Sequence, residues 1–320
     1  MEFGVFLILG FLKIIRIPNL LIIILTQYLL RICIIGTFYS ISAAKSSFGH
    51  IDFVLLVIST VLIAAGGYVI NDYFNAETDK VNKPSKMVIG TSVEPATAYK
   101  YYWILTLTGN ILGFYISFRV HYFLLGFIFP AISMMLWYYS TRYQKTILWG
   151  NLAVSFLSAM VILIVWLFEF FALRANPIGY TEAMKQLELI SVIVAAYAVF
   201  AFLTTLIREM IKDIEDLEGD RSAGFRTLPV VLGTGKSKGI ITAFGIMTML
   251  TLGLCQLLLF RMHLMLVFWY LLIALQPSIL YLIFQVMTAR SKTDFHNLSS
   301  VAKIIMVAGI LSMQLFYISY

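Results

Sequence analysis

Nine stretches of mostly apolar residues run through the chain, and each is close to the ~20 residues that an α-helix needs to cross the hydrocarbon core of a bilayer. They cover residues 20–41, 52–70, 101–118, 122–140, 148–171, 187–207, 239–260, 264–287 and 301–319. Only 12% of the residues are charged and 61% are hydrophobic, whereas an ordinary soluble domain has about 25% charged residues. The sequence therefore predicts an all-α, polytopic integral membrane protein in which nine transmembrane helices form one bundle.

Lysine and arginine are distributed unevenly between the two sides of this predicted bundle. If the N-terminus is cytoplasmic, only six of the 23 fall on the far side, namely Arg31, Lys45, Arg119, Arg174, Lys185 and Arg261. Cytoplasmic loops carry an excess of Lys and Arg, so the bias favours that orientation. It also explains the formal net charge of +7 and gives no reason to invoke a nucleic acid partner. We expect Arg31, which lies within or near the end of the first span, to extend to the outer interface.

Two acidic clusters occur where an apolar span ends, one after the second span and one after the sixth. Both have the same spacing of three and then four residues between oxygen-bearing side chains, with Asp72, Asn75 and Asp79 in the first and Asp213, Asp216 and Asp220 in the second. On an α-helix this spacing places the side chains on one face, which Asn71 shares in the first cluster. Each cluster therefore presents a row of oxygen ligands in a cytoplasmic loop at the membrane edge.

Four predicted helices separate the two clusters. This separation suggests a duplicated pair of four-helix halves, at about residues 12–145 and 146–290, followed by a final helix at 300–320. We expect the whole range 1–320 to form a single domain.

Carboxylates concentrated at the membrane need compensation, because a charged side chain inside the bilayer costs roughly 2.5–3.5 kcal/mol even on a lenient scale. A divalent cation would supply it. Mg²⁺ takes oxygen ligands from one or two carboxylates and completes its shell with water and substrate phosphates. Lys and Arg follow each cluster in the sequence and would bind the remaining phosphate oxygens. Mixed charges in cytoplasmic loops are common, so the prediction of a lipid diphosphate site depends on the repetition of the cluster.

Three segments together closely resemble the UbiA superfamily of intramembrane prenyltransferases: residues 71–84 (NDYFNAETDKVNKP), Asp213 to Asp220, and residues 224–233 (GFRTLPVVLG). The resemblance extends over the whole chain and includes the sequence Arg-Ile-Pro-Asn at residues 16–19 before the first span. Residues 212–221 (KDIEDLEGDR) are most similar to the digeranylgeranylglyceryl phosphate synthases of that superfamily. They are less similar to the haem O synthases or the dihydroxynaphthoate enzymes.

The resemblance implies Mg²⁺-dependent transfer of a prenyl group from an allylic prenyl diphosphate to a membrane-associated acceptor. The metal ligands would be Asn71, Asp72, Asn75, Asp79, Asp213, Asp216 and Asp220, with Asp72, Asp79, Asp216 and Asp220 essential for catalysis. The diphosphate would contact Lys80, Lys86, Arg142, Lys145, Arg221 and Arg226. The acceptor or prenyl pocket would include Arg16, Asn19, Tyr68 and Tyr139.

Two positions depart from the family pattern, and several alternatives stay open. Asn75 stands where the family usually has Asp, and residues 86–90 (KMVIG) replace an Arg-Pro-x-x-Ser-Gly pattern. The acceptor would be of the geranylgeranylglyceryl phosphate type in ether-lipid synthesis, or an aromatic quinone or pigment precursor. Non-catalytic binding of a prenyl lipid is another alternative. A cation-coupled transporter is a third, although its sites lie near the midplane of the membrane. We expect the site to face the cytoplasm from the cell membrane.

Overall fold

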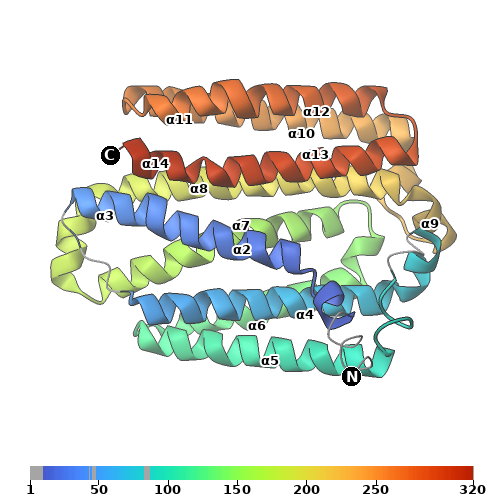
Figure 1. The fold of residues 1–320 in the computed structure, drawn as a ribbon, viewed down its shortest axis with the longest axis horizontal. Helices are drawn as coiled ribbons and strands as arrows, with labels where there is room; N and C mark the ends of the chain where they lie inside the picture. The colour runs from blue at the N-terminus through green and yellow to red at the C-terminus, as the bar shows by residue number, and fades with distance from the viewer. Residues whose placement is uncertain (1–9, 43, 45–47, 83–86, 320) are drawn as a thin grey trace.

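The computed structural model describes residues 10–42, 44, 48–82 and 87–319. Within these residues the secondary structure is helical except for one isolated β-bridge between Ile89 and Val93. The helices run back and forth along one axis (Figure 1). The prediction of an all-α bundle is confirmed.

The first half of the chain contains the helices α2 (Ile17–Leu29), α3 (Thr37–Ile41), α4 (His50–Asn82), α5 (Pro95–Arg119) and α6 (Ile128–Thr141), with a π-helical segment η1 (Leu30–Gly36) and 3-10 turns η3 (Phe123–Phe127) and η4 (Tyr143–Lys145). The second half contains α7 (Trp149–Arg174), α8 (Pro177–Glu215), α9 (Leu217–Ser222), α10 (Leu228–Arg261), α11 (Met265–Tyr270), π-helical η5 (Leu271–Leu275), α12 (Gln276–Thr288), α13 (Lys292–Leu311) and α14 (Met313–Ser319). Figure 1 shows α4, α5 and α6 along one edge and α10, α11 and α12 along the other.

Eight helical segments of the described chain are long and apolar enough to cross a membrane. They are 17–41, 50–80, 123–145, 149–174, 177–215, 228–261, 265–288 and 292–319. The remaining predicted span, 101–118, also forms a helix, α5, whose 25 residues include several Tyr, Thr and Gly that lower its apolarity. The protein is therefore an integral membrane protein by the length and composition of its helices.

Local sequence signals explain where the long helices begin. Proline lies in the first turn of α2, α5, α8 and α10, where its missing N–H costs no helical hydrogen bond. Helix α13 begins instead with a capping box, in which the Ser291 hydroxyl accepts from the Asp294 N–H and the Asp294 carboxylate accepts from the Ser291 N–H. This pattern satisfies two backbone donors that a helix start otherwise leaves open.

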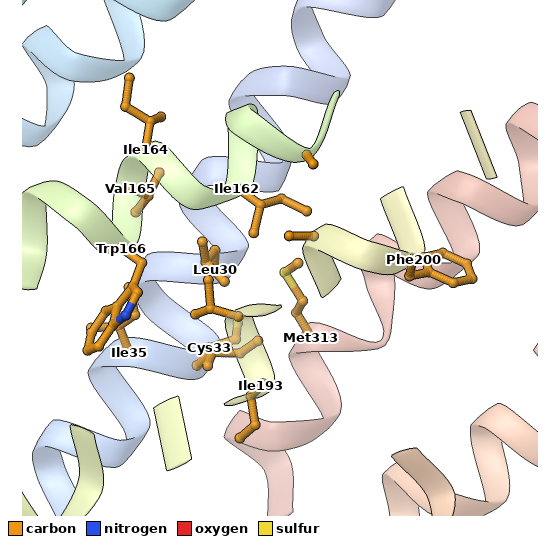
Figure 2. Close-up of a cluster of buried hydrophobic side chains, with 14 of the residues drawn as sticks. Leu30, Cys33, Ile35, Ile162, Ile164, Val165, Trp166, Ile193, Phe200 and Met313 are labelled. Atoms are coloured by element: carbon orange, nitrogen blue, oxygen red, sulfur yellow. The ribbon is translucent and has the colours of Figure 1, made fainter. Parts of the chain in front are cut away.

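The two acidic clusters lie at the same end of the bundle. Helix α4 ends there, α8 ends there, and α9 follows, at the right of Figure 1. A densely packed apolar cluster from η1, α7, α8 and α14 lies further along the bundle, around the middle of α7 and α8, with members such as Leu30, Ile162 and Met313 (Figure 2). This packing fixes the helices that carry the acidic clusters.

Arg31 was expected to extend to the outer interface, but its side chain is only 14% exposed. It donates from Nε to Glu169 Oε1 at 2.7 Å, and Glu169 is 1% exposed. The guanidinium also donates to the Phe48 carbonyl and lies 4.4 Å from the centre of the Phe53 ring. A buried charge requires a partner with good geometry, and Glu169 supplies it, so Arg31 remains inside the bundle.

Candidate active site

The first acidic cluster lies on the last turns of α4, and a neutral side chain organises half of it. Gln144 of η4 accepts from Asn71 Nδ2 at 2.8 Å and from Asn75 Nδ2 at 3.0 Å. Gln144 Nε2 donates back to Asn75 Oδ1 at 2.7 Å. The sequence analysis missed Gln144, although it lies between Arg142 and Lys145, which were both selected as candidates.

The acidic residues of this cluster have different surroundings. Asp72 accepts from Arg16 Nη2 at 2.5 Å, and the half-buried Asp79 lies further along the same helix. Lys80 pairs with Glu77 at 2.6 Å, and the two side chains are 55% and 84% exposed. Lys80 therefore has a carboxylate partner at the surface, whereas Lys86 lies outside the described residues.

The second cluster is divided between two helices. Asp213 near the end of α8 accepts from Asn151 Nδ2 at 2.8 Å. Asp220 in α9 is 7% exposed and accepts from the Thr227 hydroxyl at 3.1 Å. Asp216 lies between the helices with φ −91° and ψ 6°, in a sparsely populated backbone region that is frequent at active sites.

The expectation that Asp213, Asp216 and Asp220 lie on one uninterrupted helix is therefore wrong. The helix is interrupted at Asp216, because its backbone leaves the α-helical range and α9 begins anew at Leu217. Side-chain spacing alone cannot reveal such an interruption.

The short connection η4 brings the two clusters together. Gln144 contacts the first cluster, and the Lys145 carbonyl accepts from the Arg226 N–H at 2.9 Å. Lys145 Nζ lies 5.3 Å from the centre of the Phe225 ring, just beyond the second cluster. Helix α4 also contacts α9 directly. Residues selected from distant parts of the sequence thus meet around one loop.

The remaining candidate cations lie around this loop. Arg142 ends α6, and its carbonyl accepts from the Lys145 N–H at 3.1 Å. Arg221 is exposed at the end of α9, and Arg226 is exposed just after it. Arg221 and Arg226 closely follow Asp220 in the sequence, and all three arginine side chains are exposed and available to an anion approaching from the membrane edge.

Arg16 connects the start of α2 to the first cluster. Its guanidinium lies 5.1 Å from the centre of the Tyr68 ring, besides its pair with Asp72. Burial disfavours its charge, but Asp72, Tyr68 and Tyr139 together more than offset this, so the pKa of Arg16 is raised. Its backbone is left-handed, with φ 55° and ψ 57°, a strained conformation for a non-glycine residue and one that clusters at functional sites.

Tyr139 of α6 also belongs to this group of side chains. It interacts electrostatically with Glu209, Asp213 and Arg16. Glu209 is itself 8% exposed and pairs with Arg208 at 2.6 Å. Arg16, Tyr68 and Tyr139, three of the four residues selected for the acceptor or prenyl pocket, therefore lie near the acidic clusters.

The donor atoms of the two clusters suit a hard cation. They are carboxylate and amide oxygens, the ligands that Mg²⁺ takes, usually with water and substrate phosphates completing its shell. Within the described residues, no group of three His, Cys, Asp or Glu side chains is arranged to hold a metal ion. The two acidic clusters are nevertheless consistent with Mg²⁺ bound together with a phosphate ligand, because that ion needs only one or two carboxylates from the protein.

Helices of membrane-spanning length, with two acidic clusters joined at one end, define a polytopic membrane protein with a candidate site for a divalent cation and an anionic ligand. Residues 32–306 match the UbiA prenyltransferase family. The chain belongs to that family, as its sequence motifs indicated.

Curated relatives from archaea agree with this placement. The digeranylgeranylglyceryl phosphate synthase of Methanothermobacter thermautotrophicus is 32% identical over 205 residues, which cover 63% of this chain and 64% of the relative. The protein of the same name from Ignicoccus hospitalis is 34% identical over 202 residues, covering 62% of this chain and 61% of the relative. The matched segment thus spans less than two thirds of either relative.

Two solved structures are similar in fold. One comes from work on digeranylgeranylglyceryl phosphate synthase in membranes and has a TM-score of 0.61 and 23% identity, with 100% of both chains covered. A UbiA homologue from Archaeoglobus fulgidus bound to GPP and Mg²⁺ has a TM-score of 0.53 and 13% identity, covering 95% of this chain and 99% of that one. At these identities the likeness establishes the fold.

Proposed function

We propose that this protein transfers a prenyl group from an allylic prenyl diphosphate to a membrane-associated acceptor of the geranylgeranylglyceryl phosphate type, with Mg²⁺. One observation carries the proposal: two acidic clusters from distant helices meet around η4 at one end of an apolar bundle. The names of the curated relatives support the acceptor class. The GPP and Mg²⁺ bound by the A. fulgidus homologue support the donor and the metal.

The roles of the polar residues follow from their surroundings. Asp72, Asp79, Asp213, Asp216 and Asp220 would hold Mg²⁺, which when bound neutralises diphosphate charge and makes it a better leaving group. Asn71 and Asn75 would mainly fix the end of α4 through Gln144. The diphosphate oxygens would be bound by the cations near η4 and after α9, namely Arg142, Lys145, Arg221 and Arg226.

The apolar and aromatic side chains would serve the other end of the donor. The prenyl chain would lie among the apolar helices, where it is shielded from water. Tyr68 and Tyr139 near the clusters would face the allylic carbon as positive charge develops there, because an aromatic face attracts a cation. The acceptor hydroxyl would then form the new carbon–oxygen bond, the allylic carbon–oxygen bond to the diphosphate would break, and the hydroxyl proton would be released.

The site would face the cytoplasm from the cell membrane, in accordance with the excess of Lys and Arg on that side. The two halves around residues 12–145 and 146–290 would each contribute one acidic cluster. An aromatic acceptor is the alternative within the same reaction class.

The test is prenyl transfer by the purified protein in lipid vesicles. It would receive geranylgeranyl diphosphate with either geranylgeranylglyceryl phosphate or an aromatic acid, with Mg²⁺ or with EDTA. We expect an ether-linked product from the glyceryl phosphate, and no product in EDTA. Full activity in EDTA, or product from the aromatic acid alone, would contradict the proposal. Donor binding without release of diphosphate would favour the non-catalytic prenyl-lipid binder.

A further inference from the structure

An open pocket of about 440 Å³, called the cavity below, lies beside the start of α2, and Arg16 connects it to the first acidic cluster. It is lined by Leu12, Lys13 and the stretch 16–19, and by Lys303 of α13. Helices α2 and α13 contact each other, although 284 residues separate Asn19 from Lys303. The volume falls within the range of ordinary small-molecule sites, so the cavity can hold a compact polar group.

Lys303 is an unusual member of this wall. It lies eleven residues after Lys292, or about 16 Å along α13, in a segment apolar enough to span a membrane. A lysine within such a segment is costly and by default indicates function. Its ammonium donates to Asn19 Oδ1 at 2.7 Å. Because an ammonium carries three N–H donors and Asn19 supplies a neutral oxygen, neither its charge nor its donors are satisfied by this contact alone.

Lys303 is accompanied by two further cations. Lys13 and Arg16 line the same cavity, and the Asp72 carboxylate on the cluster side balances Arg16. The cavity therefore has an excess of positive charge at the membrane edge. A phosphate monoester, with about two negative charges and three oxygens, matches it.

The position of Arg16 separates this cavity from the candidate diphosphate site. The left-handed backbone at Arg16 holds its guanidinium between the cavity and Asp72. The cations assigned to the diphosphate come from η4 and the segment after α9, and none of them lines the cavity among the described residues. A phosphate in the cavity would thus lie beside the first acidic cluster. It would be a different group from the diphosphate of the donor.

We propose that this cavity binds the phosphate of the acceptor through Lys303 and Lys13, with Arg16 at the boundary to the first acidic cluster. The proposal rests on the proposed function and deepens it, because it makes the protein selective for acceptors that carry a phosphate. An aromatic carboxylate has one negative charge and two oxygens, and it would use the three cations less fully.

Kinetics with substitutions of Lys303 test the proposal. Lys303→Gln removes the charge and keeps a donor for Asn19, while Lys303→Arg keeps the charge. Lys100→Gln is the control, since Lys100 is exposed on α5 and lies outside the cavity. Loss of a charge-assisted hydrogen bond weakens binding by roughly tenfold or more. We expect Lys303→Gln to raise the KM for geranylgeranylglyceryl phosphate by about that factor, with Lys303→Arg restoring most of it and Lys100→Gln unchanged.

Whether the KM changes for the donor or for the acceptor shows which of the two substrates places its phosphate in the cavity. The KM for geranylgeranyl diphosphate should stay within about twofold, because uniform loss of acceptor binding leaves donor binding intact. Geranylgeranylglycerol, which lacks the phosphate, should be used equally by the wild type and Lys303→Gln. A raised KM for the donor would assign the cavity to the diphosphate and overturn the proposal. An equal loss with both acceptors would indicate a merely structural role and also overturn it.

A binding measurement separates this proposal from the proposed function. Geranylgeranylglyceryl phosphate, added without donor or metal, should raise the Tm of the detergent-solubilised wild type and of Lys100→Gln, because a ligand of the folded state stabilises it. The shift should be smaller in Lys303→Gln and in Lys13→Gln at the same ligand concentration, because both variants bind the phosphate more weakly. A shift as large as that of the wild type in both variants, or none in the wild type, would overturn the proposal even if prenyl transfer is observed. If no acceptor is prenylated, the proposed function fails, whereas a shift that depends on Lys303 still supports the phosphate site.

Discussion

At the level of single residues, the neutral Asn75 is explained by its partner Gln144. The two amides exchange a pair of hydrogen bonds, at 3.0 and 2.7 Å. A carboxylate at position 75 could still accept from Gln144 Nε2. Its second oxygen, however, would replace the Asn75 Nδ2 donor and would face Gln144 Oε1, which is also an acceptor. Glu77 does not substitute for the missing carboxylate in this structure, because it is 84% exposed and pairs with Lys80.

This contact gives a prediction for Asn75→Asp. We expect the substitution to lower the stability of the protein by roughly 1–3 kcal/mol, the cost of leaving a polar group without its hydrogen bond. Gln144→Ala should then lower the stability less in the Asn75→Asp variant than in the wild type, since the two residues are coupled. Thermal unfolding in detergent of the four proteins of the cycle measures this coupling.

The same variant also tests whether Asn75 is a metal ligand. Additive effects on Tm, together with a lower Mg²⁺ concentration for half-maximal prenyl transfer in Asn75→Asp, would show that position 75 acts on the metal and not on Gln144. Affinity at such oxygen sites rises with ligand charge, so the titration discriminates between the two roles.

The carboxylates themselves should behave differently from Asn75. Asp72→Ala and Asp220→Ala should each lower the turnover of prenyl transfer by roughly 10²-fold or more, the scale of losing one electrostatic stabiliser. Glu218→Ala is a matched control, because Glu218 is an exposed acid in the same segment as the nearly buried Asp220. Turnover is compared at saturating donor, with the Tm of each variant as a check on folding. A loss in Glu218→Ala as large as in Asp220→Ala would contradict the assignment.

The sequence identified the charged residues of this site together with Asn71 and Asn75, and missed Gln144. Acidic residues at the ends of apolar spans stand out because charge is rare in such a chain, and this was the case for Asp72 and Asp220. Gln144 carries no charge and follows no spacing, so nothing distinguished it from ordinary loop residues. Lys303 did not stand out either, because the predicted span began at residue 301 and placed Lys303 at its start. In the structure α13 begins at Lys292, so Lys303 lies well inside the helix.

At the level of helices, the predicted spans were found but were generally too short. The span 187–207 is the middle of α8, which runs Pro177–Glu215, and 239–260 lies within α10, which runs Leu228–Arg261. Apolarity marks only the part of a helix that is embedded in lipid, whereas the helix continues through polar residues at both ends. The π-helical segments η1 and η5 were also missed, since a local shift of backbone hydrogen bonds leaves no mark in the apolar pattern.

Close packing between α13 and α8 depends on a glycine. A Cβ at Gly309 would overlap the Phe200 ring, whereas a Cβ at Gly253 of α10 would meet no atom within 4 Å. Small residues let membrane helices approach closely, and added volume in a packed core costs about 1–3 kcal/mol. We therefore expect Gly309→Ala to lower the Tm, and Gly253→Ala to leave it unchanged or raise it.

Thermal unfolding of both variants in the same detergent checks this expectation. Phe200→Leu, which shortens the side chain that the new methyl group would meet, should recover part of the loss in Gly309→Ala. Equal effects of the two alanine substitutions would show that helix propensity, and not the contact with Phe200, determines the result.

At the level of the whole molecule, the residues of the candidate site are gathered at one end of the bundle. The acidic clusters and their cations lie at this end, and the apolar cluster of Figure 2 lies further along the bundle. Away from this end, Arg31 and Glu169 neutralise each other inside the bundle, and the more exposed Arg119 pairs with Asp52. The gathering of the site at one end was predictable from the order of charges along the chain, because each loop carries its charges to one side of the membrane. The pairing of Arg31 was not, since its partner lies 138 residues away.

The orientation of this bundle in the membrane can be tested with single cysteines. The native Cys33 and Cys255 would be replaced by Ala, and Ser222→Cys and Thr181→Cys would be introduced separately. Both new positions are exposed, Ser222 at the end of α9 beside the second cluster and Thr181 near the start of α8 at the opposite end. Because Lys and Arg are concentrated on the Ser222 side, a membrane-impermeant thiol reagent should label Thr181→Cys in intact cells and Ser222→Cys only after the cytoplasmic face is opened. The reverse pattern would place the acidic clusters outside, away from a prenyl diphosphate made in the cytoplasm, and the proposed orientation would be wrong.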